Sequence, residues 1–283
     1  MKVRTRGAAL AAAGLGALAL LGPQAGAADA GTRAPSATTV PTVVAHMGSQ
    51  IRLSDTTVHA GRILFKAVTN DRTHELQIAR LRPGYTVEQA NADGNKAFAG
   101  DVQAIARLDD GVSFRGGVLT HPQHPGWFST VLKAGHYVVL DQNGPGLTML
   151  TVTGQHPRRV PAPHQGTITA YSYGFGTSAG ALPADGWIRI YNQADQPHFV
   201  EISRVKAGTT AQMVRKSFAS ESQQRPSFSL RAHAGAAVIS PGVSEVVRVH
   251  LPAGRYLIMC FWPDRFTGMP HALMGMWKLV TLR

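Results

Sequence analysis

From residue 42 onward, short apolar stretches alternate with glycine, proline, asparagine and aspartate. Runs of about four to eight residues rich in Val, Ile, Leu, Tyr and Phe, bounded by such turn residues, are typical of β-strands. Two stretches have a helical pattern instead, at 87–108 with interruptions and at 210–218. The pattern therefore predicts an all-β fold with short helical insertions. We expect strands at 62–68, 75–81, 137–140, 147–152, 187–191, 199–205, 243–249 and 255–260.

The chain also repeats itself. HELQIARLRPG begins with His74 and HFVEISRVKAG begins with His198, and each histidine stands ten residues before the final glycine. Further along, AGHY in the first half aligns with AGRY in the second. Self-similarity over so long a stretch indicates a repeated structural unit. We predict two tandem β-sandwiches, at 42–156 and 167–283, joined by a Pro- and Arg-rich linker around 157–166.

The N-terminus has the pattern of a secretory signal peptide. Basic residues among the first six positions precede an apolar run at 8–21 and then small residues, with cleavage expected after Ala27 or Ala30. The apolar run is too short to span a bilayer comfortably. Residues 28–41, rich in Ala, Thr and Pro, are expected to form a flexible linker. We therefore predict a secreted or extracytoplasmic protein without a transmembrane segment in its mature chain.

The formal net charge is +12, but the lysines and arginines are scattered and never form a run of three. This distribution does not favour nucleic-acid binding. For an exported protein, an anionic envelope surface or an acidic partner is the more plausible target of basic charge. The alternative is that the many arginines only reflect the base composition of the genome and bind no partner.

The chain has one cysteine, Cys260. Because exported proteins usually pair their cysteines, a single one implies an intermolecular disulfide, a free thiol or a metal ligand. His271 and Met276 follow Cys260, and His198 begins a predicted strand upstream. A thiolate, two imidazoles and a weak thioether are the ligands of a type 1 copper site. We predict that His198, Cys260, His271 and Met276 bind one copper ion, although each alone could be an ordinary core or edge residue.

The same residues carry a family resemblance. Asn192, six residues before His198, and then Pro-Gly, AGRY, Cys260, Pro-His271 and Gly-Met276 resemble the cupredoxins, the plastocyanin-like blue copper proteins. The His-x4-Met spacing is similar to that of plastocyanin and azurin, whereas the loop between the cysteine and the histidine is longer. The resemblance is good over about 167–283 and weak over 42–154. It implies a Greek-key β-sandwich.

The resemblance also implies a type 1 copper and single-electron transfer with a redox partner protein. Carriers of this family meet their partners at an apolar patch around an exposed ligand histidine. The side chains expected to form such a patch here are Phe261, Trp262, Phe266, Met269 and Met274.

The first half is predicted to be a degenerate copy. His74 matches His198, but Asp141 occupies the position of Cys260, and no His-x4-Met follows. Without a thiolate a type 1 site cannot form, so this half is expected to be structural or to bind a partner. His121 and His124 could bind a surface metal, but exposed loop histidines are the simpler interpretation.

Enzymatic activity is not expected. Copper nitrite reductases and multicopper oxidases place a histidine beside the type 1 cysteine, whereas Met259 and Phe261 flank Cys260. Three functions remain open: a copper electron carrier, a copper-capture protein that meets a copper donor or acceptor, and a metal-free envelope-binding module.

Overall fold

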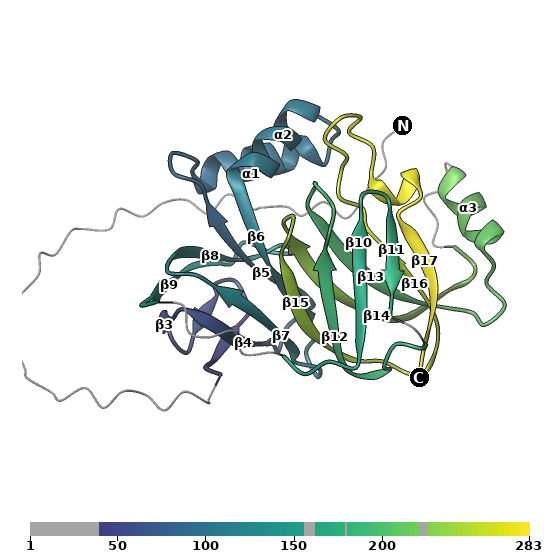
Figure 1. The fold of residues 1–283 in the computed structure, drawn as a ribbon, viewed down its shortest axis with the longest axis horizontal. Coiled ribbons are helices and arrows are strands. Elements are labelled where there is room, and N and C mark those ends of the chain that lie inside the picture. The colour runs from purple at the N-terminus through teal and green to yellow at the C-terminus, as the bar shows by residue number, and fades with distance from the viewer. Residues whose placement is uncertain (1–39, 156–161, 179, 221–225) are drawn as a thin grey trace, which may run out of the picture.

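The computed structural model describes residues 40–155, 162–178, 180–220 and 226–283. The predicted signal peptide, most of the linker at 28–41 and part of the 157–166 linker lie outside these ranges. The described chain is mostly β-strand, arranged in two sheets, as predicted. Figure 1 shows the first half (40–155), coloured purple to teal, beside the second half (162–283), coloured green to yellow.

Each half contains strands and a short helical insertion. The first half contains β1 (Thr42–His46), β2 (Arg52–Leu53), β3 (Thr57–His59), β4 (Gly61–Val68), β5 (His74–Leu81), α1 (Val87–Ala97), α2 (Val102–Gly111), β6 (Val112–Thr120), β7 (Gly126–Leu132), β8 (Gly135–Asp141) and β9 (Leu147–Thr153). The second half contains β10 (Gly166–Tyr171), β11 (Gly174–Thr177), β12 (Asp185–Asn192), β13 (His198–Val205), α3 (Ala211–Ala219), β14 (Ser229–Ile239), β15 (Ser244–His250), β16 (Gly254–Met259), the 3-10 helix η1 (His271–Met274) and β17 (Trp277–Leu282).

The two halves have the same strand connections. In the first half β1 lies parallel to β4, β4 pairs with β7, and β5 lies between β6 and β8. In the second half β10 lies parallel to β12, β12 pairs with β15, and β13 lies between β14 and β16. The eight-stranded sheet has the order β11-β10-β12-β15-β7-β4-β1-β2 and the nine-stranded sheet the order β17-β16-β13-β14-β6-β5-β8-β9-β3. This confirms the predicted tandem β-sandwiches, although the boundary between them stays a prediction.

Both sheets run through the junction of the halves. β14 pairs with β6 in one sheet, and β15 pairs with β7 in the other. The buried Gln77 side chain ties the junction together, because its Nε2 donates to the carbonyl oxygens of Gly116 and Val238, each at 3.0 Å. Its Oε1 accepts the Val238 N–H at 2.8 Å. One apolar core cluster accordingly contains residues from both halves.

The helical insertions form where the sequence predicts them, with capping residues that fix their starts. Thr86 and Gln89 make a capping box at α1, and the Asp101 carboxylate accepts backbone N–H groups at the start of α2. The predicted 87–108 stretch is therefore two helices, while α3 begins after the N-cap Thr210. Within the described ranges, no helix is long and apolar enough to cross a membrane.

Candidate metal centre

Three elements of the second half bring His198, Cys260 and His271 to one end of the sandwich. His198 is the first residue of β13, and Cys260 directly follows β16. β13 and β16 are antiparallel neighbours with Glu201 opposite Met259, so these two ligands lie side by side on adjacent strands. His271 starts η1, at the return of the loop that Figure 1 shows in yellow beside α2.

Three donor atoms of these residues converge. Cys260 Sγ lies 3.7 Å from His198 Nδ1 and 4.0 Å from His271 Nδ1, and the two Nδ1 atoms are 3.1 Å apart. All three side chains are fully buried. In the part of the chain that the structure describes, these three residues form the one group of three or more His, Cys, Asp or Glu side chains close enough to hold a metal ion. We call it the His–Cys–His cluster.

Met276 is tied to the same cluster through its backbone. The Cys260 N–H donates to the Met276 carbonyl oxygen at 3.2 Å, and the Met276 N–H donates to the His271 carbonyl oxygen at 2.9 Å. The Met276 side chain is fully buried in the core. Gly275 precedes it with a φ of 107°, a conformation that favours glycine and allows the turn from η1 into β17. Ligation by the Met276 sulfur stays a prediction.

Burial sets the protonation of the three ligands. Desolvation lowers the pKa of His198 to about 3, assisted by the nearby His271, and lowers the pKa of His271 to about 4. Desolvation also raises the pKa of the Cys260 thiol to about 12. At neutral pH the metal-free cluster therefore holds two neutral imidazoles and a thiol. A metal ion that binds must displace the thiol proton.

The donor set fits copper. One sulfur and two imidazole nitrogens lie within 4.8 Å of one another, so a single ion can reach all three. Among the described residues, the Nε2 atoms of His198 and His271 are buried without hydrogen-bond partners. The two Nδ1 atoms instead face each other and the Cys260 sulfur, so an ion placed between them would bind all three donors and offset the cost of burying this polar cluster.

Asn192 holds the segment that presents His198. Its side-chain Nδ2 donates to the carbonyl oxygens of Gln196 and Ile239, at 2.8 and 2.9 Å, and its Oδ1 accepts the Ala194 N–H. Ile239 lies opposite His198 on β14. The asparagine six residues before the histidine thus fixes the turn between β12 and β13.

Asp264 holds the loop between Cys260 and His271. Its buried carboxylate accepts hydrogen bonds from the Tyr173 hydroxyl and Gln196 Nε2, both at 2.9 Å, and from the N–H and hydroxyl of Thr267, both at 2.8 Å. Burial alone would raise the pKa of Asp264, but the hydrogen bonds from Gln196, Thr267 and Tyr173 outweigh it and lower the pKa to about 2. The Tyr173 ring also packs edge-on against His271, with centroids 5.6 Å apart.

Sequence reasoning missed this network around Asp264. Two of its members, Tyr173 in the β10–β11 turn and Gln196 before β13, are distant in the chain and carry no pattern of their own. The one local signal is an aspartate three residues before a threonine in this loop. Aspartates that accept hydrogen bonds from N–H groups two and three residues later fix tight turns.

Trp262 anchors the same loop on the first half. Its ring packs edge-on against Phe98 and Phe114, with centroids 5.7 and 5.3 Å apart, and its Nε1 donates to Asp109 Oδ1 at 3.1 Å. Desolvation raises the pKa of Asp109 to about 7. Nearby, Gly268 has a φ of 71° and approaches the backbone of Gly100 so closely that a Cβ would collide with it.

The burial of Trp262 corrects the prediction that it belongs to an exposed apolar patch. An aromatic-rich loop can cover the surface or fill a gap, and here its largest ring packs inward against Phe98 and Phe114. Phe266 is 70% exposed and Met269 is also exposed, so these two do lie at the surface. His271 is fully buried, so the expectation of an exposed ligand histidine is wrong. Tyr173 packs against it, and the structured loop surrounds it.

The equivalent place in the first half is occupied by an ion-pair network. His74 Nδ1 lies 2.6 Å from Asp141 Oδ2, and His74 Nε2 lies 2.8 Å from Asp71 Oδ1. Arg72 lies 3.6 Å from Asp141, whose other carboxylate oxygen accepts the backbone N–H groups of Glu75 and Asn143. The predicted match between Asp141 and Cys260 is thus seen in space.

No protein-family model and no curated protein sequence matches the chain. Solved structures that match include auracyanin A from Chloroflexus aurantiacus, a blue copper protein, with 16% identity, a TM-score of 0.29, and coverage of 41% of this chain and 100% of that one. A copper nitrite reductase from Nitrosomonas europaea matches with 10% identity, a TM-score of 0.24, and coverage of 87% and 94%. A multicopper oxidase from Pediococcus acidilactici matches with 7% identity, a TM-score of 0.26, and coverage of 86% and 59%.

These matches correct one expectation. Nitrite reductases and multicopper oxidases match most of the chain, so the prediction that the protein is not an enzyme is contradicted and is withdrawn. Because the identities lie below 25% and the TM-scores below 0.5, we base the function on the geometry of the site. The chain has a cupredoxin-like fold repeated in tandem, with the His–Cys–His cluster in its second copy.

Proposed function

We propose that this protein binds one copper ion outside the cytoplasmic membrane and transfers single electrons through it. The observation that carries the proposal is the convergence of Cys260 Sγ with the Nδ1 atoms of His198 and His271 in a buried site. Met276, tied by its backbone to both Cys260 and His271, would supply the weak fourth ligand. When bound, copper alternates between its two oxidation states and so accepts and releases one electron.

The residues around the site support this role by holding the ligands still. Asn192 fixes the turn before His198, and the Asp264 network fixes the loop before His271. Full burial of the three ligands keeps water from the donor atoms. Ligands that are held in place without metal need to move little when the charge on the site changes.

The visible spectrum tests the proposal. Copper added to the mature protein should bind at one ion per chain and give an intense thiolate-to-copper charge-transfer band. Cys260→Ser should abolish the band, because a serine oxygen is a poor donor for that transition, whereas His59→Ala on the distant β3 should leave it intact. An intense band that survives Cys260→Ser would place the site elsewhere. A protein that takes up no copper would point to the metal-free envelope-binding function.

Copper capture is a second candidate function, and an exposed thioether near the site favours it. Met269 lies exposed at the surface of the Cys260–His271 loop, where a soft sulfur could meet Cu(I). A carrier should show a reversible redox couple with fast electron exchange. A capture protein should instead bind copper tightly, exchange electrons slowly and pass the ion to an acceptor, and Met269→Leu should slow its uptake of Cu(I).

The extracytoplasmic location rests on the N-terminal sequence and is tested separately. N-terminal sequencing should find the mature chain starting at Ala28 or Gly31. If the basic charge holds the protein to an anionic envelope surface, a salt wash of whole cells should release it. An intact Met1 in a cytoplasmic fraction would contradict export.

A further inference from the structure

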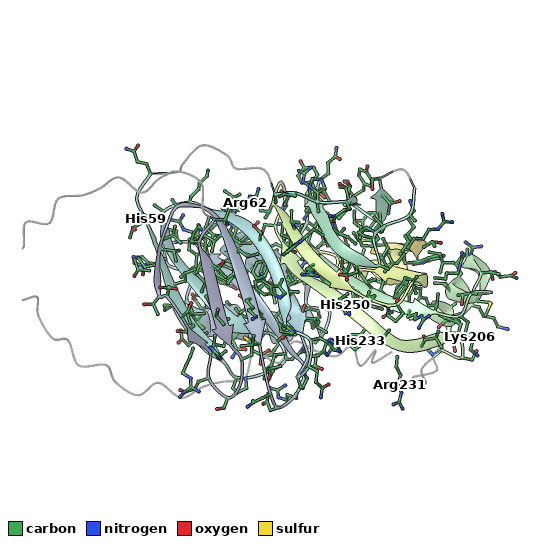
Figure 2. All side chains as sticks on the ribbon, turned by 90° about the horizontal axis from the view of Figure 1, so that it is seen from below. His59, Arg62, Lys206, Arg231, His233 and His250 are labelled. Atoms are coloured by element: carbon green, nitrogen blue, oxygen red, sulfur yellow. The ribbon has the colours of Figure 1, made fainter. Side chains whose placement is uncertain are left out.

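Four histidines line a cavity at the junction of the two halves, away from the His–Cys–His cluster. His121 and His124 flank the turn between β6 and β7, His233 lies in β14, and His250 ends β15. The cavity that they line has a volume of about 210 Å³. Figure 2 shows His233 and His250 near each other on the same side of the molecule. We call it the four-histidine cavity.

The rings already approach the spacing of imidazoles that share an ion. The ring centroids of His121 and His233 are 5.1 Å apart with their planes at 89°, and those of His124 and His250 are 6.2 Å apart. Two imidazoles on one tetrahedral ion, with bonds of about 2.0–2.1 Å, have centroids about 5 Å apart. His121 from the first half and His233 from the second half therefore have a suitable spacing.

Hydrogen bonds orient three of the rings. His121 Nδ1 lies 2.9 Å from the Thr73 hydroxyl, His233 Nδ1 lies 3.4 Å from the Arg231 carbonyl oxygen, and His250 Nδ1 lies 3.2 Å from the Asp185 carboxylate. A carbonyl or carboxylate oxygen can only accept, so Nδ1 carries the proton in His233 and His250. This leaves the Nε2 lone pair available.

A histidine whose Nδ1 is hydrogen-bonded to an oxygen while Nε2 stays available is typical of metal-binding sites. Ligating imidazoles commonly donate their second ring N–H to a carboxylate, a carbonyl or another oxygen, which fixes the ring and its tautomer. The neighbouring Arg248, which also lines the cavity, is paired with Asp185 at 3.4 Å, so its charge is partly balanced.

The cavity is separate from the His–Cys–His cluster. On the β13–β14 pair, His198 lies opposite Ile239, whereas His233 lies opposite Ser203. Five residues along a strand separate the two positions, which is about 17 Å at a rise of about 3.4 Å per residue. An ion in the cavity would therefore not share ligands with the copper site.

We propose that the four-histidine cavity binds one divalent ion of borderline softness, Zn²⁺ or Cu²⁺. Nε2 of His121 and Nε2 of His233 provide the first two ligands, and side-chain rotation brings in His124 and His250. This rotation is required, because among the described residues the one group of three donors already close enough for an ion is the His–Cys–His cluster. Since each half contributes two histidines, the ion links the halves.

Zinc calorimetry tests the proposal once the first site is disabled. In the His198→Ala/Cys260→Ser background, Zn²⁺ should bind at one ion per chain and raise the melting temperature. Adding His121→Ala or His233→Ala should weaken zinc binding at least about tenfold, since mutating even the groups that support a metal ligand costs about that much. His59→Ala is the matched control, because His59 is an exposed histidine on the far side of the first half in Figure 2, and it should change nothing.

Elemental analysis of otherwise unaltered protein gives a second readout if the background variant fails to fold. After dialysis against zinc, His233→Ala should carry one ion fewer per chain than the wild type, and His59→Ala should carry the same number. Absence of zinc binding, or binding that His121→Ala and His233→Ala leave unchanged, would overturn the proposal. So would binding of inorganic phosphate without zinc, because the cavity would then be an anion site.

Discussion

The two halves use the same position of the same fold in opposite ways. In the second half, His198 Nδ1 faces the Cys260 sulfur, and the Nε2 atoms of His198 and His271 have no hydrogen-bond partner among the described residues. In the first half, His74 Nδ1 faces the Asp141 carboxylate at 2.6 Å, and Asp71 takes Nε2. Cys260 in the second half is thus replaced by Asp141 in the first. The histidine beside Cys260 keeps a ring nitrogen without a hydrogen bond, whereas both ring nitrogens of His74 contact protein groups.

The difference teaches what makes a buried histidine available to a metal. Both nitrogens of His74 lie within hydrogen-bond distance of a carboxylate oxygen, so neither faces a position that an ion could take. The second half has no such pairing at His198, so its imidazole stays neutral and can ligate. We therefore expect the second half to bind the metal, and the first half to be the one whose histidine stabilises the fold without metal.

The largest expected effect is on copper binding, when the equivalent histidines of the two halves, His198 and His74, are removed in turn. His198→Ala should weaken copper binding at least about 1,000-fold, which is about 4 kcal/mol or more, because it deletes one of three converging donors. His74→Ala should leave the copper stoichiometry at one per chain. Elemental analysis and a competition titration measure both, and two equivalent coppers in the wild type would break the comparison.

The next effect concerns stability without metal. Asp141→Ala should lower the free energy of unfolding by about 3–5 kcal/mol, because it removes the buried partner of His74 Nδ1 and the acceptor of two backbone N–H groups. The matched change in metal-free protein, Cys260→Ala, should cost only about 1 kcal/mol. Urea unfolding of both variants compares them directly, and equal costs would show that the ion-pair network is not what stabilises the first half.

A pH effect should appear where the two halves meet at Trp262. Because burial raises the pKa of Asp109 to about 7, the folded state binds more protons than the unfolded state between about pH 4 and pH 7. The contribution of protonated Asp109 to the free energy of unfolding is therefore complete below about pH 4 and is lost as the pH rises through about 7. Asp109→Asn keeps an acceptor for Trp262 and should stabilise the protein at pH 8 by on the order of 1–3 kcal/mol.

Thermal unfolding across pH 5–8 measures this change. The Asp109→Asn gain should shrink toward pH 5, where Asp109 of the wild type is itself protonated. A gain that does not depend on pH would rule out titration of Asp109 as its cause.

The smallest effect concerns the support of the copper loop. Tyr173→Phe removes one of the hydrogen bonds to Asp264 and should weaken copper binding about 3- to 10-fold, in line with about 0.5–1.5 kcal/mol for a hydrogen bond. Tyr171→Phe, at an exposed tyrosine of the same hairpin, is the control. Equal affinities for both variants would mean that the Asp264 network does not position His271.

Local sequence patterns predicted the β-rich fold, about half of its strands and the residues of the His–Cys–His cluster. Alternating apolar residues predicted β4 and β13, and the spacing of His198, Cys260 and His271 predicted three side chains that the structure brings together. Their convergence follows because strand pairing is set by the fold, and each ligand stands at a strand end or in the loop that follows one.

Other features depend on contacts that no local pattern records. Trp262 was expected at the surface, because nothing near it shows that Phe98 and Phe114 of the other half provide a buried niche. The Asp264 network joins three separate segments. His121 and His124 were interpreted as exposed loop histidines, yet His121 is half-buried and both line a cavity completed by His233 and His250. Such arrangements come from tertiary packing, which single-segment reasoning does not reach.

The pairing of β6 with β14 and of β7 with β15 has a consequence for the unit in which this protein can exist. Separating the halves would expose four strand edges, each a row of unpaired backbone groups open to pairing with another chain. The first half therefore covers the edges of β14 and β15 in the second half by pairing with them. A fragment that kept every candidate copper ligand but lacked β6 and β7 should be prone to aggregation. The first half, which has no candidate copper site, thus keeps the second half from pairing with other chains.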